Sequence, residues 1–327
     1  MTVRIKEVAK LAKVSVATVS RVLNNSGYVS TKTKERVLKA IEELNYQPTK
    51  IARLLARKKS NFKVALVAGE WVRKAMVSKL DEFYVVIFKA IDDFAKDHKM
   101  KIQIMAPEDE ISLNKIDGFL LVGGEINHKI VNKFKNTGKP MVLVDQYIAG
   151  LRIDSVISDG FDGALYATNY LISKGLRKII MIHGSLTHFS FRDRFNGYKT
   201  AMEQNGFLPR SYEFNEREDN MSMIIDMILN THGKPDAIFG ANDTAALRAM
   251  EELKKRGFKI PEDVSIVGFD DILSASISTP KLTTLKIFKY ELGSIAVRRL
   301  FNLMMGEETH PVKISLFTEF IKRESTI

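Results

Sequence analysis

The amino-terminal fold is decided by the stretch Lys6-Glu7-Val8-Ala9-Lys10-Leu11-Ala12-Lys13-Val14-Ser15-Val16-Ala17-Thr18-Val19-Ser20-Arg21-Val22-Leu23-Asn24. Apolar residues recur at helical spacing in both of its halves. They are Ile5, Val8, Ala9 and Ala12, and then Val19, Val22 and Leu23. Ser15 suits the start of the second half, because its hydroxyl can accept a hydrogen bond from an unpaired backbone N–H. The pattern predicts two short helices joined by a tight turn.

The outer face of the second helix is small and polar apart from one long cation. It carries Ala17, Thr18 and Arg21. Such a helix fits the major groove of DNA, where Arg21 can pair with a guanine edge or a phosphate. An ordinary helix pair with a solvated face has the same periodicity, so spacing alone leaves both interpretations open.

Charge distinguishes these two interpretations. Residues 1–60 contain 14 Lys and Arg against 4 Asp and Glu, whereas the rest of the chain contains 36 against 35. Nearly all of the formal net charge of +11 therefore lies on the first sixty residues. A basic head on a near-neutral body is typical of a protein that binds a polyanion.

The following segments extend this head. Residues 25–28 have turn composition, and Ser30 can cap a third helix that runs to about Leu44. The residues expected to face inward on that helix are Val37, Leu38, Ile41 and Leu44. Residues 46–60 are cationic, with Pro48 placed for a first helical turn, and so short a helix is marginal by itself.

Two segments of the head, Arg4 to Ala9 and Val14 to Asn24, resemble the amino-terminal signature of the LacI/GalR family of bacterial transcription regulators. The resemblance implies DNA contacts, to which the outward-facing Thr18 is added: Ser15, Val16, Ala17, Thr18, Arg21, Asn24 and Tyr28. The family varies its base preference at the positions of Val16 and Ala17, which here can offer only apolar contact, for example to a thymine methyl. The operator sequence therefore cannot be deduced.

The resemblance also identifies residues 48–60 as a hinge that folds on DNA and packs against a second copy. Ala52 and Leu55 share one face of it, and the family inserts the residue matching Leu55 into the minor groove. An apolar side chain inserted in this way unstacks bases and bends the duplex. A basic linker that never orders is the alternative interpretation.

From Lys63 onward, short apolar runs alternate with helical patterns, which is typical of parallel sheets covered by helices. The fold class expected is α/β: a three-helix headpiece with a helix-turn-helix and a hinge helix, then two doubly wound parallel-sheet lobes of the periplasmic-binding-protein type. The expected domains are 1–47 (headpiece), 48–60 (hinge) and 61–327 (body). Within the body we expect an N-lobe of about 61–149 and 281–305, and a C-lobe of about 150–280 and 306–327.

Such lobes bind a ligand at the carboxyl ends of their strands. The family resemblance extends to this region through the segments 192–198, 240–243, 266–271, 279–284 and 322–326. Family effector contacts carry over to Arg194, Asn242 and Asp270. A guanidinium, an amide and a carboxylate suit a polyol, although each can equally serve as an ion pair or a helix cap.

Three further effector contacts are weaker candidates. Asp159 follows an expected strand and can equally cap the next helix. Trp71, the only tryptophan, and Phe191 can stack on a sugar ring or belong to the core. Two features depart from the family pattern: a short connection between Met105 and Asp117, shared with some galactoside-responsive members, and the absence of an aromatic residue at 218–221.

Composition and motifs exclude several classes of protein. The chain has no cysteine, no metal spacing among its six histidines, no long apolar run and no secretory signal, so we expect a cytoplasmic protein without a metal, a cofactor or a membrane segment. No catalytic residue is expected, because phosphate-binding and nucleophile motifs are absent. No heptad repeat follows the last signature, so a homodimer is the simplest assembly.

The sequence therefore predicts a sequence-specific regulator that binds double-stranded operator DNA. We expect a repressor of sugar-utilisation genes, controlled allosterically by a small effector, most simply a sugar, bound between the lobes. A regulator that takes a purine or another corepressor is the main alternative. A plain solute-binding protein and a nucleotide-dependent enzyme are less favoured, because of the basic head and the missing Gly-x-Gly-x-x-Gly fingerprint.

Overall fold

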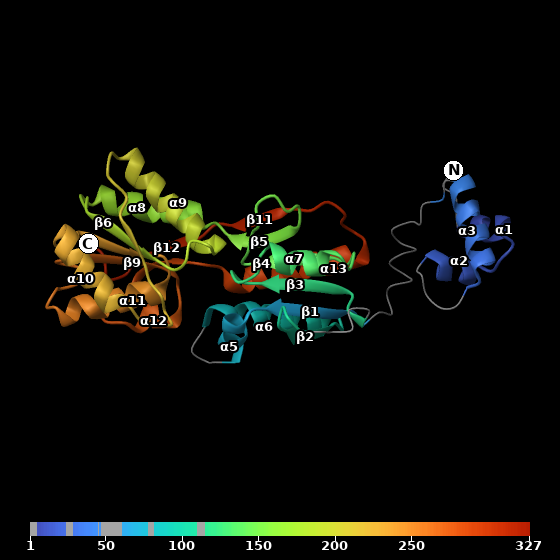
Figure 1. The fold of residues 1–327 in the computed structure, drawn as a ribbon, viewed down its shortest axis with the longest axis horizontal. Helices are drawn as coiled ribbons and strands as arrows, with labels where there is room; N and C mark the ends of the chain where they lie inside the picture. The colour runs from blue at the N-terminus through green and yellow to red at the C-terminus, as the bar shows by residue number, and fades with distance from the viewer. Residues whose placement is uncertain (1–4, 24–28, 45, 47–60, 78–81, 110–114) are drawn as a thin grey trace. The chain divides into compact units, whose positions relative to one another are not determined.

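A computed structural model describes residues 5–23, 29–44, 46, 61–77, 82–109 and 115–327. The chain divides into compact units, and the boundary between the headpiece and the body falls between Ser60 and Asn61. Figure 1 shows the helical headpiece and the body with its two sheets. None of the described helices is long and apolar enough to cross a bilayer.

The headpiece consists of α1 (Ile5–Leu11), α2 (Val16–Leu23) and α3 (Thr31–Glu43). The side-chain oxygen of Ser15 accepts a hydrogen bond from the backbone N–H of Thr18 at 3.1 Å, which caps α2 as expected. Ser30 caps α3 in the same way through Thr33. The core contains one apolar face from each helix together with Tyr46, which follows α3; the helical residues are Val8, Ala9, Ala12, Val19, Val22, Val37 and Ala40.

One expectation for the headpiece core is wrong. Leu38 is 49% exposed. Its neighbour Val37 is fully buried and Ile41 packs against the same core, so these two residues, one helical turn apart, already cover the face that α3 presents. Leu38 lies about 100° away from Val37 around the helix, on the side that faces solvent.

The body contains two six-stranded sheets. In the first, the strand order is β11-β5-β4-β3-β1-β2 and all pairings are parallel. Its strands are β1 (Lys63–Ala68), β2 (Lys101–Met105), β3 (Gly118–Val122), β4 (Met141–Val144), β5 (Asp154–Ser158) and β11 (Lys313–Leu316). The helices of this N-lobe are α5 (Glu70–Val77), α6 (Glu82–Asp97), α7 (His128–Lys135) and α13 (Lys289–Met305).

The second sheet has the order β12-β10-β9-β8-β6-β7, and only the β10–β12 pairing is antiparallel. Its strands are β6 (Ile179–His183), β7 (Ser211–Glu213), β8 (Ala237–Gly240), β9 (Ser265–Asp270), β10 (Thr283–Lys286) and β12 (Glu319–Ile321). The helices of this C-lobe are α8 (Gly160–Ser173), α9 (Phe189–Gln204), α10 (Met221–His232), α11 (Asp243–Lys255) and α12 (Leu273–Ile277).

The sheets correct three of the expected lobe assignments. β5 and β11 fall in segments expected in the C-lobe but pair in the first sheet, whereas β10 falls in a segment expected in the N-lobe but pairs with β9. An apolar run predicts a strand but does not identify its hydrogen-bonding partners, because these come from distant parts of the chain. The chain consequently passes between the lobes after β5, after β10 and after β11.

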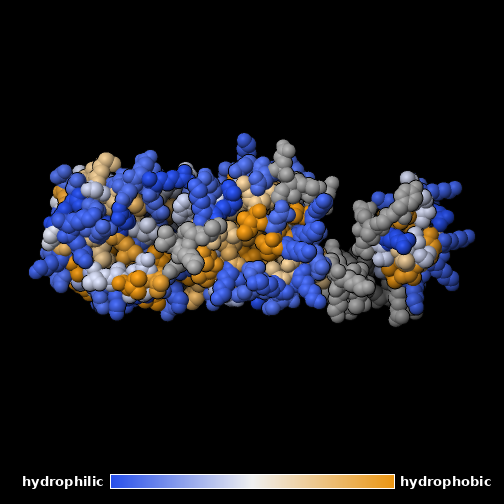
Figure 2. All heavy atoms as spheres, turned by 90° about the horizontal axis from the view of Figure 1, so that it is seen from below, coloured by the Kyte–Doolittle hydropathy of each residue, from blue (hydrophilic) through white to orange (hydrophobic). Residues whose placement is uncertain are grey.

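The central strands of both sheets are buried. β3 and β4 are buried at every position, as expected for the centre of a parallel sheet covered on both faces. The edge strand β2 is instead exposed at Gln103 and Ile104. Figure 2 shows apolar surface patches among largely hydrophilic side chains on the face it displays. The central strands therefore hold their carboxyl ends, and the residues that follow them, in fixed positions.

Candidate functional site

The outward face of α2 is the first candidate site. Ser15, Val16, Ala17 and Arg21 are exposed, and Thr18 is half-buried. The Ser15 and Thr18 hydroxyls lie 2.9 Å apart, so both side chains also serve the cap of α2. The structure thus presents Val16, Ala17 and Arg21 on one accessible face. The other expected DNA contacts, Asn24, Tyr28, Ala52 and Leu55, lie outside the described residues.

Arg194 and Asp270 form a buried ion pair in the C-lobe. Arg194 comes from α9 and Asp270 from the carboxyl end of β9, and the Arg194 Nη2 to Asp270 Oδ1 distance is 2.9 Å. The Arg194 Nη1 donates a hydrogen bond to the Ala241 carbonyl, and the guanidinium carbon lies 3.9 Å from the centroid of the Phe269 ring. With only 3% of its surface exposed, Arg194 is held at three points at the strand ends.

Asn242 lies beside this pair and is already hydrogen-bonded. Its Oδ1 accepts a hydrogen bond from the Ala245 backbone N–H at 2.9 Å and so caps α11. Its Nδ2 donates to the Glu216 carboxylate at 3.0 Å. The cap interpretation of Asn242 is therefore confirmed, and an effector contact through Nδ2 would require exchange of the Glu216 hydrogen bond.

Asp243, which follows Asn242, is a buried acid that the sequence analysis did not single out. Its carboxylate accepts hydrogen bonds from the Thr284 hydroxyl and from the Ile272 backbone N–H. Gly268 leaves the space for it, since a Cβ there would lie 2.2 Å from Asp243 Oδ1. Burial, helped by repulsion from Asp270, raises the pKa of Asp243 to about 8. Asp243 thus joins α11 to β10 and to the loop that follows Asp270.

The N-lobe contributes Asp145, at the carboxyl end of β4, which the sequence analysis also missed. The Tyr84 hydroxyl donates a hydrogen bond to Asp145 at 3.0 Å. Burial raises the pKa of Asp145 to about 6, while the positive charge of Arg194 on the other lobe opposes the shift. Asp145 directly follows an apolar strand, so the expectation that a ligand binds at the carboxyl ends of the strands could have found it.

Six described residues other than glycine have a positive φ, and three of them lie at these strand ends. Asp145 has φ of 52°, Asp270 of 111° and Asp271 of 51°. Residues other than glycine rarely adopt such values, and each costs on the order of 1–3 kcal/mol. Strained residues of this kind concentrate at binding sites, where the surrounding structure holds them in place. Their occurrence at facing strand ends of both lobes marks the cleft between them as the candidate ligand site.

The structure separates the three weaker effector candidates from one another. Trp71 is 40% exposed on α5, and its ring packs edge-on against Tyr84, the donor to Asp145. Asp159 caps α8 by accepting from the Asp162 N–H at 3.0 Å. Phe191 packs against Gly184 and stacks on His188. Only Trp71 is therefore connected to the acid at the N-lobe strand end.

Two sets of contacts bridge the lobes around the cleft. The Glu125 carboxylate of the N-lobe lies 3.8 Å from the Arg217 guanidinium of the C-lobe. The ring of Tyr147 in the N-lobe packs edge-on against Phe189 in the C-lobe, and the Lys313 ammonium of the N-lobe lies 5.6 Å from the Phe189 ring centroid. Separation of the lobes would therefore break these contacts.

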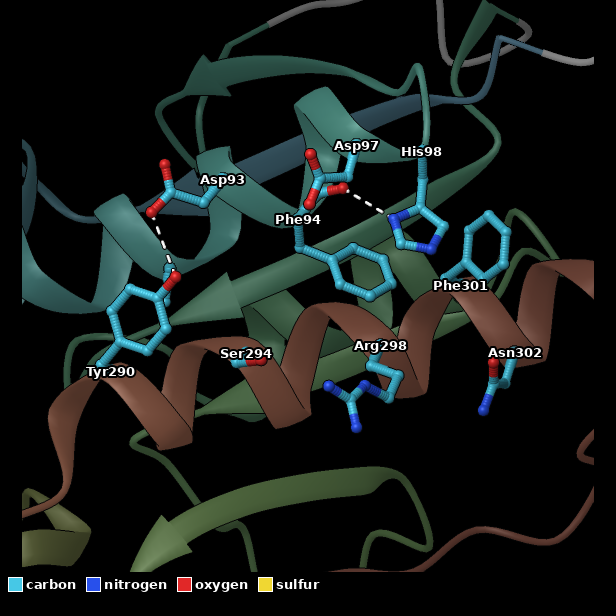
Figure 3. Close-up of a pocket in the computed structure, with 10 residues that line it drawn as sticks. Asp93, Phe94, Asp97, His98, Tyr290, Ser294, Arg298, Phe301 and Asn302 are labelled. Carbon is cyan, nitrogen blue, oxygen red and sulfur yellow. Dashed lines mark hydrogen bonds between the residues drawn. The ribbon is translucent and has the colours of Figure 1, made fainter.

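A separate hollow of about 510 Å³ lies on the N-lobe between α6 and α13. Figure 3 shows Phe94, Phe301 and His98 gathered between these helices, with Tyr290 donating a hydrogen bond to Asp93 at 3.1 Å. Neither the strand-end acids nor Arg194 line this hollow. Among the described residues, no group of three or more His, Cys, Asp or Glu is arranged to hold a metal ion.

We expect Asp243→Asn to change how stability depends on pH. The folded-state pKa of about 8 lies above the unfolded value, so the folded chain binds more protons between about pH 4 and pH 8, and the contribution of Asp243 falls as the pH rises through this window. Asparagine does not ionise, so the variant does not lose stability in this way as the pH rises. The variant should therefore gain stability relative to the native chain between pH 5 and pH 8, by up to about 1.4 kcal/mol per pH unit.

Urea unfolding at pH 5, 6, 7 and 8, followed by circular dichroism, measures this difference. Asp162→Asn, which changes an acid in the first turn of α8, is the matched control. Its free energy of unfolding should depend on pH in the same way as that of the native chain. A difference between Asp243→Asn and the native chain that stays constant with pH would contradict the raised pKa.

Comparisons with known proteins agree with this architecture. Residues 4–49 match the family model described as bacterial regulatory proteins, lacI family, and residues 168–326 match a periplasmic binding protein-like domain. The chain is 32% identical to a ribose operon repressor of Halalkalibacterium halodurans, over 98% of this chain and 96% of that protein.

Solved structures extend the similarity to the whole fold. A complex of the transcriptional regulator CelR with cellobiose has a TM-score of 0.71, with 28% identity over 99% of both chains. The Lac repressor dimer bound to operator and the anti-inducer ONPF also has a TM-score of 0.71, with 26% identity over 100% of both chains. The described headpiece and lobes therefore resemble those of a regulator bound to cellobiose and of a repressor bound to its operator and an anti-inducer.

Proposed function

Because the chain belongs to the LacI family of bacterial transcription regulators, a non-enzymatic family of DNA-binding repressors with an effector domain, we propose that it represses sugar-utilisation genes. The effector is a polyol, most simply a sugar or galactoside, bound between the lobes. The observation that carries this proposal is the Arg194–Asp270 pair, which faces Asp145 across the cleft. Hydrogen-bond donors and acceptors of this kind suit vicinal hydroxyl groups.

The proposed site residues follow from this geometry. Arg194, Asp270, Asn242 and the newly found Asp145 contact the effector, while Trp71 lies near enough to respond to it. In the headpiece, α2 enters the major groove, with Val16, Ala17 and Arg21 on the accessible face. Asn24, Tyr28, Ala52 and Leu55 remain sequence-based proposals for DNA contacts.

Effector binding alters DNA affinity only if the effector prefers one arrangement of the lobes. The contacts that bridge the lobes, Glu125 with Arg217 and Tyr147 with Phe189, change when the cleft opens or closes around a ligand. A homodimer with two headpieces matches a pseudo-palindromic operator, and the similar Lac repressor binds its operator as a dimer. The protein acts in the cytoplasm, where its DNA target lies.

The test is a titration of operator affinity with candidate effectors. A randomised duplex library selected with the full-length protein supplies the operator, and fluorescence anisotropy then measures affinity with ribose, cellobiose, galactosides, free purines and nucleosides. An inducing sugar is expected to weaken operator binding by about 5- to 150-fold, the usual range of allosteric coupling. Asp270→Asn should bind operator normally and lose the response, whereas Asp162→Asn should keep both.

The same titration decides between the proposal and its alternative. A purine that strengthens operator binding would show that the protein is a corepressor-dependent regulator. Operator affinity unchanged by every compound would remove the proposed switch.

A further inference from the structure

The charges of the described cleft residues restrict which effectors can enter. Arg194 is the buried cation at the C-lobe strand ends, and two of its nitrogens are paired: Nη2 with Asp270 and Nη1 with the Ala241 carbonyl, while the face of its guanidinium lies against Phe269 and its Nε has no hydrogen-bond partner among the described residues. An arriving anion would share this guanidinium with Asp270, whose carboxylate already offsets its charge. Displacing Asp270 would leave a buried carboxylate without its counter-charge, which is costly.

Asp145 adds a second negative charge near this pair. It faces the pair from the N-lobe, where the pull of Arg194 and the repulsion of Asp270 both reach it. Its pKa of about 6 leaves it ionised at pH 7.5. Asp243 contributes little charge there, because its pKa of about 8 keeps much of it protonated. One guanidinium therefore faces two carboxylates.

The described charged groups around the contacts that bridge the lobes do not reverse this balance. The acids are Glu70, Glu125, Glu216 and Asp193, and the bases are Arg73, Lys74, Arg217 and Lys313, the last of which interacts with Asp193. Glu70 pairs with Lys74 at 2.8 Å, and Arg217 lies 3.8 Å from Glu125. Burial lowers the pKa of His188, which faces Gly124, and so keeps its ring neutral. The excess negative charge set by Asp145 thus remains.

We infer that the cleft takes an uncharged polyol and discriminates against the same polyol when it carries a carboxylate or a phosphate. The inference rests on the proposed effector function and specifies its ligand class. Like charges brought together in a desolvated site repel each other, whereas hydroxyl groups can donate to both Asp145 and Asp270. Asp145 is then a specificity-determining residue, since it distinguishes ligands that differ only in charge.

The experiment compares matched ligands on the full-length protein at pH 7.5. The sets are galactose, galacturonate and galactosamine; glucose, glucuronate and glucosamine; and ribose with ribose 5-phosphate. Isothermal titration calorimetry gives the affinities, and the fluorescence of Trp71, whose ring contacts Tyr84 beside Asp145, reports occupancy independently. For any neutral member that binds, the anionic counterpart is expected to bind about 10-fold more weakly or worse.

Asp145→Asn is the diagnostic variant, because asparagine keeps an acceptor for the Tyr84 hydroxyl and removes the charge. In this variant the Kd values of the neutral and anionic ligands should lie within about 3-fold of each other, because the anion binds more tightly. Asp226→Asn, a surface substitution on α10, should leave the ratio of the anionic to the neutral Kd as it is in the native chain. Circular dichroism of both variants verifies that they fold.

The inference would be overturned if an anionic ligand bound as tightly as its neutral counterpart, or if no neutral ligand bound. It would also be overturned if the difference in Kd between neutral and anionic ligands persisted in Asp145→Asn. These outcomes are separate from failure of the proposed function. A neutral polyol that binds with the expected discrimination but leaves operator affinity unchanged would support the ligand class and contradict the switch.

Discussion

Removal of residues 1–60 is expected to abolish specific binding to duplex DNA while affinity for the effector stays unchanged. The first sixty residues carry almost all of the net positive charge, and the body beginning at Asn61 forms its own compact unit. The phosphate backbone supplies much of the affinity of a regulator for DNA, and base contacts supply its specificity. The loss should exceed about 10³-fold, the usual ratio of specific to non-specific affinity.

Anisotropy with the selected operator measures this loss, and calorimetry with the effector provides the control. In the full-length chain, Arg21→Ala should weaken operator binding by about 10-fold, if Arg21 pairs with a base. Lys32→Ala removes an equal charge from α3 and should have a smaller effect. A body fragment that still bound the operator as tightly as the intact protein would refute the assignment of DNA binding to the headpiece.

Substitution of Arg194 by Met is expected to abolish effector binding and to destabilise the body by about 3–5 kcal/mol, the usual cost of breaking a buried ion pair. The substitution leaves Asp270 buried without its guanidinium and removes the hydrogen bond to the Ala241 carbonyl. Arg194→Lys should not restore binding, because an ammonium cannot reproduce the planar fork that reaches both partners.

Urea unfolding followed by circular dichroism measures the destabilisation, and calorimetry measures effector binding. The double variant Arg194→Met with Asp270→Asn separates the two effects: it should recover part of the stability, since no isolated charge remains, but not the binding. If Arg194→Met kept an unchanged free energy of unfolding together with a normal effector response, the pair would have neither proposed role.

The headpiece could be predicted in detail, because its helices depend on local signals. The i, i+3, i+4 spacing identified the buried Val8, Ala9 and Val19, and the hydroxyls of Ser15 and Ser30 identified two helix starts. The error at Leu38 shows the limit of such reasoning. Periodicity gives the direction of an apolar stripe but not its width, which depends on how much surface α1 and α2 present to α3.

The candidate ligand site could be predicted only in part. Motif resemblance identified Arg194 and Asp270, which the structure joins in an ion pair. Asp145 also follows a strand, but its significance required the facing position of Arg194 on the other lobe. Asp243 gave no signal of burial, because burial of an acid depends on the approach of Thr284 and Ile272 from distant segments.

The sequence by itself determined the basic head, the helix starts within it and the alternation of strands and helices in the body, because all of these depend on neighbouring residues. Only the tertiary structure decided that β5 and β11 join one sheet and β10 the other, and that two strained acids face one guanidinium. Strand pairing and electrostatic balance are set by groups that are far apart in the chain, so no local pattern could specify them.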